Sequence, residues 1–178
     1  MNVQLIPFAE QHLAELAPMV DDPDVARFTR FPTPLPADFL ASLFARYQAG
    51  RAKGTSELFA AIDSASGRLV GLGLALRIDA EACELELGYL VAPADRGRGV
   101  ATAMLAQLTD WAFGTGAAIR VSLMIDVENV GSQKAAERCG YLLEGTLRNT
   151  YVKRGRRADI QIWSRLASDP IANPAGSA

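Results

Sequence analysis

Three short apolar runs follow one another in the middle of the chain, and they limit its fold more than any other feature. The first two, Leu58–Ile62 and Leu69–Leu76, are separated by the polar and small residues 63–67, a pattern typical of a β-hairpin. In the third run, Glu84–Val91, charged and apolar residues alternate, as in a strand with one buried face. The spacing therefore predicts three consecutive strands.

Apolar residues recur at helical spacing on both sides of these strands. A helix is expected over Leu13–Val20, ending or kinking near Ala17 because Pro18 has no N–H to donate. The alternating prolines of Phe31–Pro36 exclude regular structure, and the last of them can open a helix that ends at Gly50. The other expected elements are strands at Gln4–Phe8, Val121–Ile125, Tyr141–Arg148 and Ala158–Leu166, and helices at Val100–Ala112 and Gly131–Cys139.

The expected order is β-α-α-β-β-β-α-β-α-β-β, without an internal repeat or a linker between two cores. This order predicts a single α/β domain over residues 1–166 with a mixed sheet. Residues 167–178 are mostly small residues and proline, so we expect a disordered tail there.

Composition excludes several classes of protein. Of 178 residues, 49% are hydrophobic and 21% charged, which excludes a disordered or collagen-like chain. The formal net charge of −2 argues against a nucleic-acid partner. No apolar run approaches the ~20 residues that span a bilayer, and the first residues lack a signal-peptide pattern, so we expect no membrane partner. Cys83 and Cys139 form no CxxC pattern and His12 is the one histidine, so we expect free thiols, a cytoplasmic location and no metal.

A glycine-rich turn connects the third strand to the helix that follows it. The strand ends at Pro93, and the helix begins near Gly99, two residues after Gly97. Glycines leave backbone N–H groups uncovered, and a helix N-terminus adds positive partial charge. These are the requirements for binding a phosphate or pyrophosphate group, to which Arg96 and Arg98 can add charge-assisted contacts.

Two phosphate-binding motifs do not match this turn. A P-loop requires Lys followed by Ser or Thr after its last glycine, whereas Val100 and Ala101 follow here. The dinucleotide motif GxGxxG has glycine or alanine at the position of Thr102. A nucleotide-binding protein is therefore disfavoured, and a purely structural turn stays open.

The segment Arg96-Gly97-Arg98-Gly99-Val100-Ala101 resembles the Arg/Gln-x-x-Gly-x-Gly/Ala motif of the GNAT superfamily of acyl-CoA-dependent N-acetyltransferases. Downstream, Asn129-Val130-Gly131-Ser132 and Cys139-Gly140-Tyr141 resemble the Asn-x-x-Ser and Gly-Phe/Tyr segments of that superfamily. The residues Leu143-Glu144-Gly145-Thr146-Leu147-Arg148 are similar to the Rim-type branch, which acetylates protein N-termini. The resemblance covers roughly Val3–Leu166, and it implies a GNAT-type fold, in which about four helices flank a mixed, mostly antiparallel sheet.

The resemblance also implies a site for acetyl-CoA. In the family, backbone amides of the motif hold the coenzyme pyrophosphate, and the preceding strand pairs with the pantetheine arm as an added strand would. Asn129 matches a family asparagine that contacts the coenzyme, and it can also cap the following helix. Arg96 and Gly97 would shape the turn, and Leu90 and Val91 would pair with the pantetheine arm. The amides that would bind the pyrophosphate are those of Arg98, Gly99, Val100 and Ala101.

Three side chains are candidates for proton transfer. Glu86 lies on the strand where the superfamily often has a water-linked general base, and Glu144 matches a Rim-type glutamate near the acceptor amine. Ser132, in the coenzyme-binding segment, matches a serine proposed as the proton donor to the thiolate. Each has a structural alternative. Glu86 could be an exposed polar strand residue, Glu144 a solvated carboxylate at a strand end, and Ser132 a hydroxyl in the first turn of a helix. Many GNAT enzymes have a tyrosine acid at the position of Ala136, so Ser132 or water would take that role here, or protonation of the leaving group matters little.

The resemblance implies direct transfer of an acetyl group from acetyl-CoA to a primary amine in a ternary complex. The acceptor would be a protein N-terminal α-amine or a small-molecule amine. Without a histidine base in the core segments, a weakly basic amine fits better, because neutralising a lysine amine at pH 7 costs roughly 4–5 kcal/mol and an α-amine about 1 kcal/mol. The alternative, kept open by Ala136, is a catalytically silent acyl-CoA-binding module.

Three further features bear on the acceptor and on partners. Phe28 and the loop Phe31–Pro36 are expected to roof the acceptor pocket or to form a rigid connector. Trp163 could face the core or a partner, which leaves a homodimer open. A basic hairpin tip could contact an acidic acceptor or coenzyme phosphate, or simply be a solvated turn; its residues are Arg148, Lys153, Arg154, Arg156 and Arg157.

Overall fold

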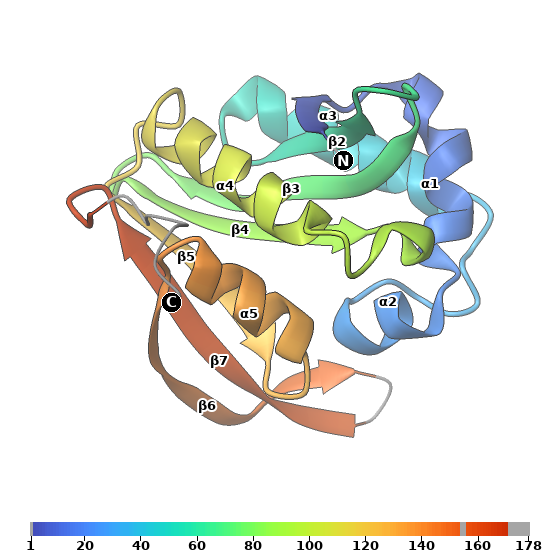
Figure 1. The fold of residues 1–178 in the computed structure, drawn as a ribbon. Coiled ribbons are helices and arrows are strands. Elements are labelled where there is room, and N and C mark those ends of the chain that lie inside the picture. The colour runs from blue at the N-terminus through green and yellow to red at the C-terminus, as the bar shows by residue number, and fades with distance from the viewer. Residues whose placement is uncertain (1, 154–155, 171–178) are drawn as a thin grey trace.

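A seven-stranded sheet with helices on both faces forms the molecule (Figure 1). The computed structural model describes residues 2–153 and 156–170. The strand order is β1-β2-β3-β4-β5-β7-β6, and all neighbours are antiparallel except β4 and β5. The single mixed α/β domain predicted from the sequence is therefore confirmed. The elements are β1 Val3–Pro7, α1 Leu13–Val20, α2 Pro23–Phe28, α3 Phe39–Lys53, β2 Glu57–Asp63, β3 Leu69–Asp79, β4 Glu84–Val91, α4 Val100–Phe113, β5 Arg120–Asp126, α5 Val130–Arg138, β6 Leu142–Lys153 and β7 Arg156–Leu166, with short 3-10 helices η1 Glu10–His12 and η2 Pro93–Asp95.

Side-chain alternation along β4 divides the core between the two faces of the sheet. Leu85 and Leu87 pack beneath α4 against Leu105 and Leu108, in a cluster that α5 also joins. Leu90 points to the opposite face, into a second cluster with residues of α1, α2 and α3. Figure 1 shows α4 and α5 together on one face of the sheet. A strand buried on both faces can position groups toward either side.

The helices differ from the predicted ones in three places. Five α-helices are present in the described residues, not about four, because the six-residue α2 is too short to show a repeated apolar stripe. The helix α1 continues through Pro18 to Val20, since a proline in its last turns removes a single N–H donor. The helix α3 begins at Phe39, and it ends not at Gly50 but at Gly54, whose left-handed φ of 67° terminates the helix.

The two parallel strands separate before either of them ends. Residues 84–87 of β4 pair with residues 120–123 of β5, whereas β4 continues to Val91 and β5 to Asp126. The second half of β4 still pairs with β3, where Leu74 lies opposite Gly88 and Leu72 opposite Leu90. The edge of β4 that faces β5 is therefore open from Gly88 onward.

Other expectations concern single residues and the chain end. Cys83 and Cys139 are free thiols, as predicted. Trp163 is buried in the core and not on the surface. The N–H of Ala167 donates to the Ile119 carbonyl at 3.0 Å, while residues 171–178 of the expected tail lie outside the described residues. In the part of the chain that is described, no helix has both the length and the apolar character needed to cross a membrane.

Candidate functional site

A cavity of about 510 Å³ lies where β4 and β5 separate. Its walls come from α2, the second half of β4, the turn that leads into α4, and the turn that leads into α5. Nine of the predicted coenzyme residues line it. They are Leu90, Val91, Arg96, Gly97, Gly99, Val100, Ala101, Asn129 and Ser132.

The first amides of α4 face this cavity without a capping side chain. Gly99 occupies the N-cap position with a left-handed φ of 80°, and no side chain among the described residues accepts a hydrogen bond from the first turn. Gly97 also has a left-handed φ, of 72°, which glycine adopts at no steric cost. An ideal Cβ at either glycine would meet no atom within 4 Å, so the space beside these amides is open. The turn therefore presents N–H groups and the positive end of a helix dipole to an anion.

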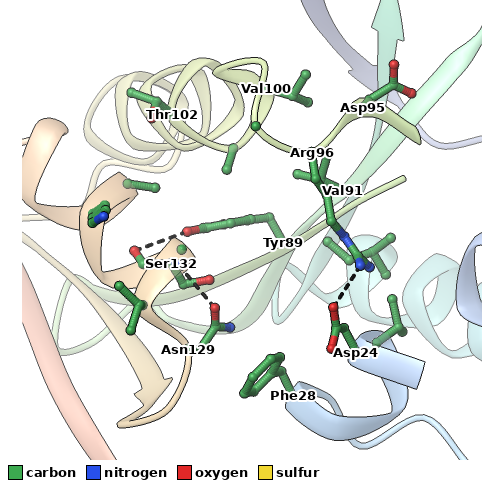
Figure 2. Close-up of a pocket in the computed structure, with 18 of the residues that line it drawn as sticks. Asp24, Phe28, Tyr89, Val91, Asp95, Arg96, Val100, Thr102, Asn129 and Ser132 are labelled. Atoms are coloured by element: carbon green, nitrogen blue, oxygen red, sulfur yellow. Dashed lines mark hydrogen bonds and ion pairs between the residues drawn. The ribbon is translucent and has the colours of Figure 1, made fainter. Parts of the chain in front are cut away.

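The two arginines of the turn pair with carboxylates of the protein, and their contacts with a phosphate group stay a prediction. Arg98 does not line the cavity, and its Nη1 donates to Asp95 Oδ1 at 3.1 Å. Asp95 is fully buried, and Arg68 Nη2 donates to the same oxygen at 2.9 Å. Arg96 lines the cavity, but its guanidinium contacts carboxylates of α2, including Asp24 (Figure 2). Both guanidinium groups are therefore neutralised by carboxylates: that of Arg98 by Asp95, three residues away, and that of Arg96 by Asp22 and Asp24, more than 70 residues away.

The N-terminus of α5 forms the opposite wall, and here the helix is capped. The Oδ1 of Asn129 accepts a hydrogen bond from the Ser132 amide at 3.2 Å. The capping role considered for Asn129 is therefore confirmed, and its contact with a coenzyme stays a prediction. Ser132, in the first turn of α5, lines the same cavity and faces the Tyr89 hydroxyl (Figure 2).

Tyr89 is a site residue that the sequence reasoning missed. Its ring lies in the cavity between the α4 and α5 sides, and its hydroxyl lies 3.5 Å from the Ser132 carbonyl oxygen (Figure 2). Burial raises the pKa of Tyr89 to about 12, so its phenol stays protonated at neutral pH. Its position on β4, next to Gly88 and directly before two predicted coenzyme residues, was the available signal.

Glu86 does not line the cavity, and it lies on the other face of β4. It alternates with the core residues Leu85 and Leu87, and it is half-buried. Its charge contributes to the raised pKa values of Tyr47 and Tyr151, after the larger effect of burial on each. Glu86 is therefore near enough to both phenols to influence them electrostatically.

Glu144 is separated from the cavity and engaged in an ion pair. Its Oε1 accepts from Arg120 Nη1 at 2.8 Å and from Ser164 Oγ at 2.7 Å, and Arg120 also bonds its other oxygen. These hydrogen bonds, first that of Arg120, lower the pKa of Glu144 to about 2. A carboxylate of such low pKa is a weak base, and Arg120 lies at the start of β5, the end opposite the turn that carries Asn129. We therefore assign Glu144 a structural role.

Further lining residues come from α2 and α5. Phe28 lines the cavity, whereas Phe31 packs edge-on against Phe39 with ring centroids 5.5 Å apart. Lys134 and Arg138, one helical turn apart on α5, add positive charge to the wall.

In the described ranges, no group of His, Cys, Asp and Glu is arranged to hold a metal ion. Of the predicted basic hairpin tip, Arg154 lies outside the described residues, and Arg157 Nη1 donates to the Asn149 carbonyl at 2.9 Å.

Known proteins share this architecture. RimL, a ribosomal L7/L12 alpha-N-protein acetyltransferase in complex with coenzyme A, superposes with a TM-score of 0.86 at 16% identity, covering 93% of this chain and 94% of RimL. The microcin C7 self-immunity acetyltransferase MccE, in complex with acetyl-CoA and AMP, has a TM-score of 0.84 at 19% identity, covering 92% of both chains. At these identities the likeness establishes the fold.

Sequence comparison gives the family. YdaF of Bacillus subtilis (strain 168), whose name carries a provisional assignment as a ribosomal N-acetyltransferase, is 31% identical over 100 residues. The match spans 56% of this chain and only about half (55%) of YdaF. The model of the acetyltransferase (GNAT) domain matches residues 2–142, which include the open edge of β4, the uncapped start of α4 and the start of α5. The chain therefore belongs to the acetyltransferase (GNAT) domain family.

Proposed function

We propose that the protein is an acetyl-CoA-dependent N-acetyltransferase that transfers an acetyl group directly to a primary amine in a ternary complex. One observation carries this proposal: the open edge of β4 and the uncapped N-terminus of α4 face the same cavity. An extended arm needs a strand edge, and a pyrophosphate needs free amides, so the cavity fits the two ends of one coenzyme. RimL and MccE, which share the fold, bind coenzyme A and acetyl-CoA.

The coenzyme would be held mainly by backbone groups. The amides of Arg98, Gly99, Val100 and Ala101 would bind its pyrophosphate, and Leu90 and Val91 would pair with its pantetheine arm. A backbone N–H near Leu90 would donate to the thioester oxygen as charge develops there. Lys134 and Arg138 supply positive charge on the α5 wall for phosphate groups.

The reaction forms a C–N bond, breaks the C–S bond and moves one proton from the amine. Glu86, on the face of β4 that does not carry α4, would accept that proton through a water molecule. The thiolate would take a proton from Ser132 or from water, since the fully buried Ala136 offers no hydroxyl at the usual position. A thiol pKa near ~8.5 makes the thiolate a tolerable leaving group.

The acceptor would be an α-amine of a protein N-terminus or a weakly basic small-molecule amine. An α-amine with a pKa near ~7.8 is partly neutral at pH 7 and needs only a weak base such as a carboxylate. The α-N-protein acetyltransferase named among the neighbours, RimL, supports this class.

The release of free coenzyme A thiol from acetyl-CoA, on addition of peptides with a free N-terminus, tests the proposal. We expect thiol release that depends on the amine and is absent with N-terminally blocked peptides. Binding of acetyl-CoA without thiol release for any α-amine or small amine would contradict the proposed enzyme and favour the silent binding module that Ala136 keeps open.

The remaining proposals concern the state of the protein in the cell. We propose residues 1–166 as the catalytic domain, a cytoplasmic location, and a homodimer formed through β6. This strand lies at the sheet edge and exposes Leu142, Leu143 and Leu147. Long apolar edge strands are ready templates for pairing with another chain. Light scattering should give a dimer mass that Leu143→Lys converts to a monomer, and a monomer for the unaltered protein would contradict it.

A further inference from the structure

The short helix α2 forms one side of the cavity and is tied to both neighbouring walls. On the α4 side, the Arg96 guanidinium contacts Asp22 Oδ1 at 2.6 Å and Asp24 Oδ2 at 3.0 Å. On the α5 side, Arg27 Nη2 contacts Glu128 Oε2 at 3.1 Å. Figure 2 shows the Arg96 side chain directed toward Asp24 and away from the start of α4.

The Asp22 carboxylate has two roles at once. Its Oδ1 accepts hydrogen bonds from the amides of Asp24 and Val25, at 3.0 and 3.1 Å, and so caps α2. The same oxygen accepts from Arg96. The charge of Arg96 is therefore opposed by two carboxylates of α2, although this residue lines a cavity suited to an anionic ligand.

We propose that Asp22 and Asp24 are positioning residues that act through Arg96, by competing with the phosphate groups of the coenzyme for its guanidinium. The proposal rests on the proposed function, because it takes acetyl-CoA as the ligand of the cavity. A guanidinium binds carboxylate and phosphate with the same bidentate geometry, so one anion can replace the other. The uncapped amides of α4 begin four residues beyond Arg96 and would bring the pyrophosphate within its reach.

The exchange has a consequence for α2. When Arg96 turns to the coenzyme, α2 loses its ties to the α4 side and keeps the contact of Arg27 with Glu128. Coenzyme binding would then loosen one end of the helix that carries Phe28, a residue of the cavity wall.

The double variant Asp22→Asn plus Asp24→Asn tests the competition. Asparagine caps a helix as well as aspartate does, so α2 keeps its cap while Arg96 loses both anions. We expect the Kd and KM for acetyl-CoA to fall about three- to tenfold, the range that two partly exposed ion pairs can supply, without a matching change in kcat. The same substitutions in an Arg96→Ala background should change neither value. Equal gains in both backgrounds, or no gain in either, would overturn the proposal.

A matched control breaks an ion pair elsewhere. Glu57→Gln disrupts the pair of Arg51 and Glu57, which joins α3 to β2 and does not line the cavity. This variant should leave the Kd for acetyl-CoA unchanged. A gain as large as that of the double variant would show that any lost surface carboxylate improves binding, and it would overturn the specific role of α2.

Hydrogen exchange separates this inference from the proposed function. The amides of Ala26 and Thr29 close the hydrogen bonds of α2 onto Asp22 and Val25. Arg96→Ala should speed their exchange in the free protein, and acetyl-CoA should do the same in the unaltered protein. Unchanged exchange in free Arg96→Ala would overturn the tie. Faster exchange in that variant, together with no acetyl-CoA binding to the unaltered protein, would contradict the proposed ligand and with it the competition.

Discussion

Two helices begin at the same cavity, and they differ in whether a side chain caps the N–H groups of the first turn. At α5, Asn129 occupies the N-cap and accepts a hydrogen bond from the Ser132 amide. At α4, the N-cap is Gly99, and in the part of the chain that the structure describes no side chain accepts a hydrogen bond from the first turn. Both ends line the cavity at the gap between β4 and β5, but within the described residues a capping side chain is present at only one of them.

The difference separates a structural helix start from one that is available to a ligand. Glycine in place of a capping side chain costs only roughly a few tenths of a kcal/mol of stability, which a folded protein tolerates where something else is gained. At α4 the gain is a set of free amides beside the open strand edge. The carboxylates near this turn pair with Arg68, Arg96 and Arg98, and none of them caps the helix.

Gly99→Val gives the largest expected effect, because it fills the space beside the uncapped amides. A non-glycine residue at φ 80° costs about 1–2 kcal/mol, and the new side chain stands where the phosphate groups would lie. We expect the Kd for acetyl-CoA to rise more than about tenfold, which corresponds to 1.4 kcal/mol of lost binding. Calorimetric titration measures this.

Gly54→Val is the matched control for that variant. Gly54 also has a left-handed φ, of 67°, and open space around an ideal Cβ, but it ends α3 away from the cavity. It should lose similar stability and keep its affinity for acetyl-CoA. If the two variants bind acetyl-CoA equally well, the α4 start is not the coenzyme site.

Ser132→Ala tests whether the capped helix contributes chemistry as well as structure. We expect kcat to fall at least about tenfold, the lower end of what a general acid supplies, with a smaller change in the KM for acetyl-CoA. Ser66→Ala, in the β2–β3 turn, is the control for a lost hydroxyl. Steady-state rates decide the question, and unchanged turnover would remove Ser132 from the mechanism.

Substitutions of Asn129 separate its cap from its predicted contact with the coenzyme. Asn129→Ala should lower the free energy of unfolding by about 1 kcal/mol, and Asn129→Ser should restore most of it because serine also caps. If the asparagine amide contacts acetyl-CoA, both variants lose affinity. Chemical denaturation and titration give the two quantities, and equal stability of the Ala and Ser variants would show that the cap contributes nothing.

Glu144→Gln should give the smallest effect, since its partners are protein groups. Its side chain is 42% exposed, so the pair with Arg120 contributes at most about 1 kcal/mol after solvent screening. The pKa of Glu144 is lowered from 4.5 to about 2, so its contribution is present above pH 4.5 and is lost as the pH falls toward 2. The stability difference from the unaltered protein should therefore shrink between pH 6 and pH 3, with turnover at pH 7 unchanged. A large loss of turnover at pH 7 would return Glu144 to the mechanism.

Local patterns predicted most of the fold and the position of the glycine-rich turn before α4. The strands β2, β3 and β4 follow from the alternation of polar and apolar residues and from a hairpin pattern. Gly97 and Gly99 mark the turn before α4, because glycine adopts a left-handed φ at no steric cost and leaves the backbone N–H groups uncovered. The helix α2 was missed although Asp22 before Pro23 is a helix-start signal, because six residues hold no repeated apolar stripe.

Tertiary contacts decided what the sequence could not show. Arg96 lies 72 residues from Asp24, and no local pattern tells whether its guanidinium meets that carboxylate or a ligand. Glu144 fits a family motif, but the place of β6 at the sheet edge puts it beside Arg120 and Ser164. Tyr89 was not predicted as a site residue, because its contact with the Ser132 carbonyl requires α5 to lie across the gap from β4.

Thermal unfolding with and without acetyl-CoA, beside ATP and NAD, tests the central claim most directly. Ligand at about 100 times its Kd adds about 2.7 kcal/mol, which raises the Tm by roughly 5–10 °C for a chain of this size. We predict this rise with acetyl-CoA alone, its persistence in Gly54→Val and its reduction to about half or less in Gly99→Val, since a tenfold higher Kd leaves about 1.4 kcal/mol. A Tm that acetyl-CoA leaves unchanged in the unaltered protein, or raises equally in both variants, would contradict the assignment of the α4 start as the coenzyme site.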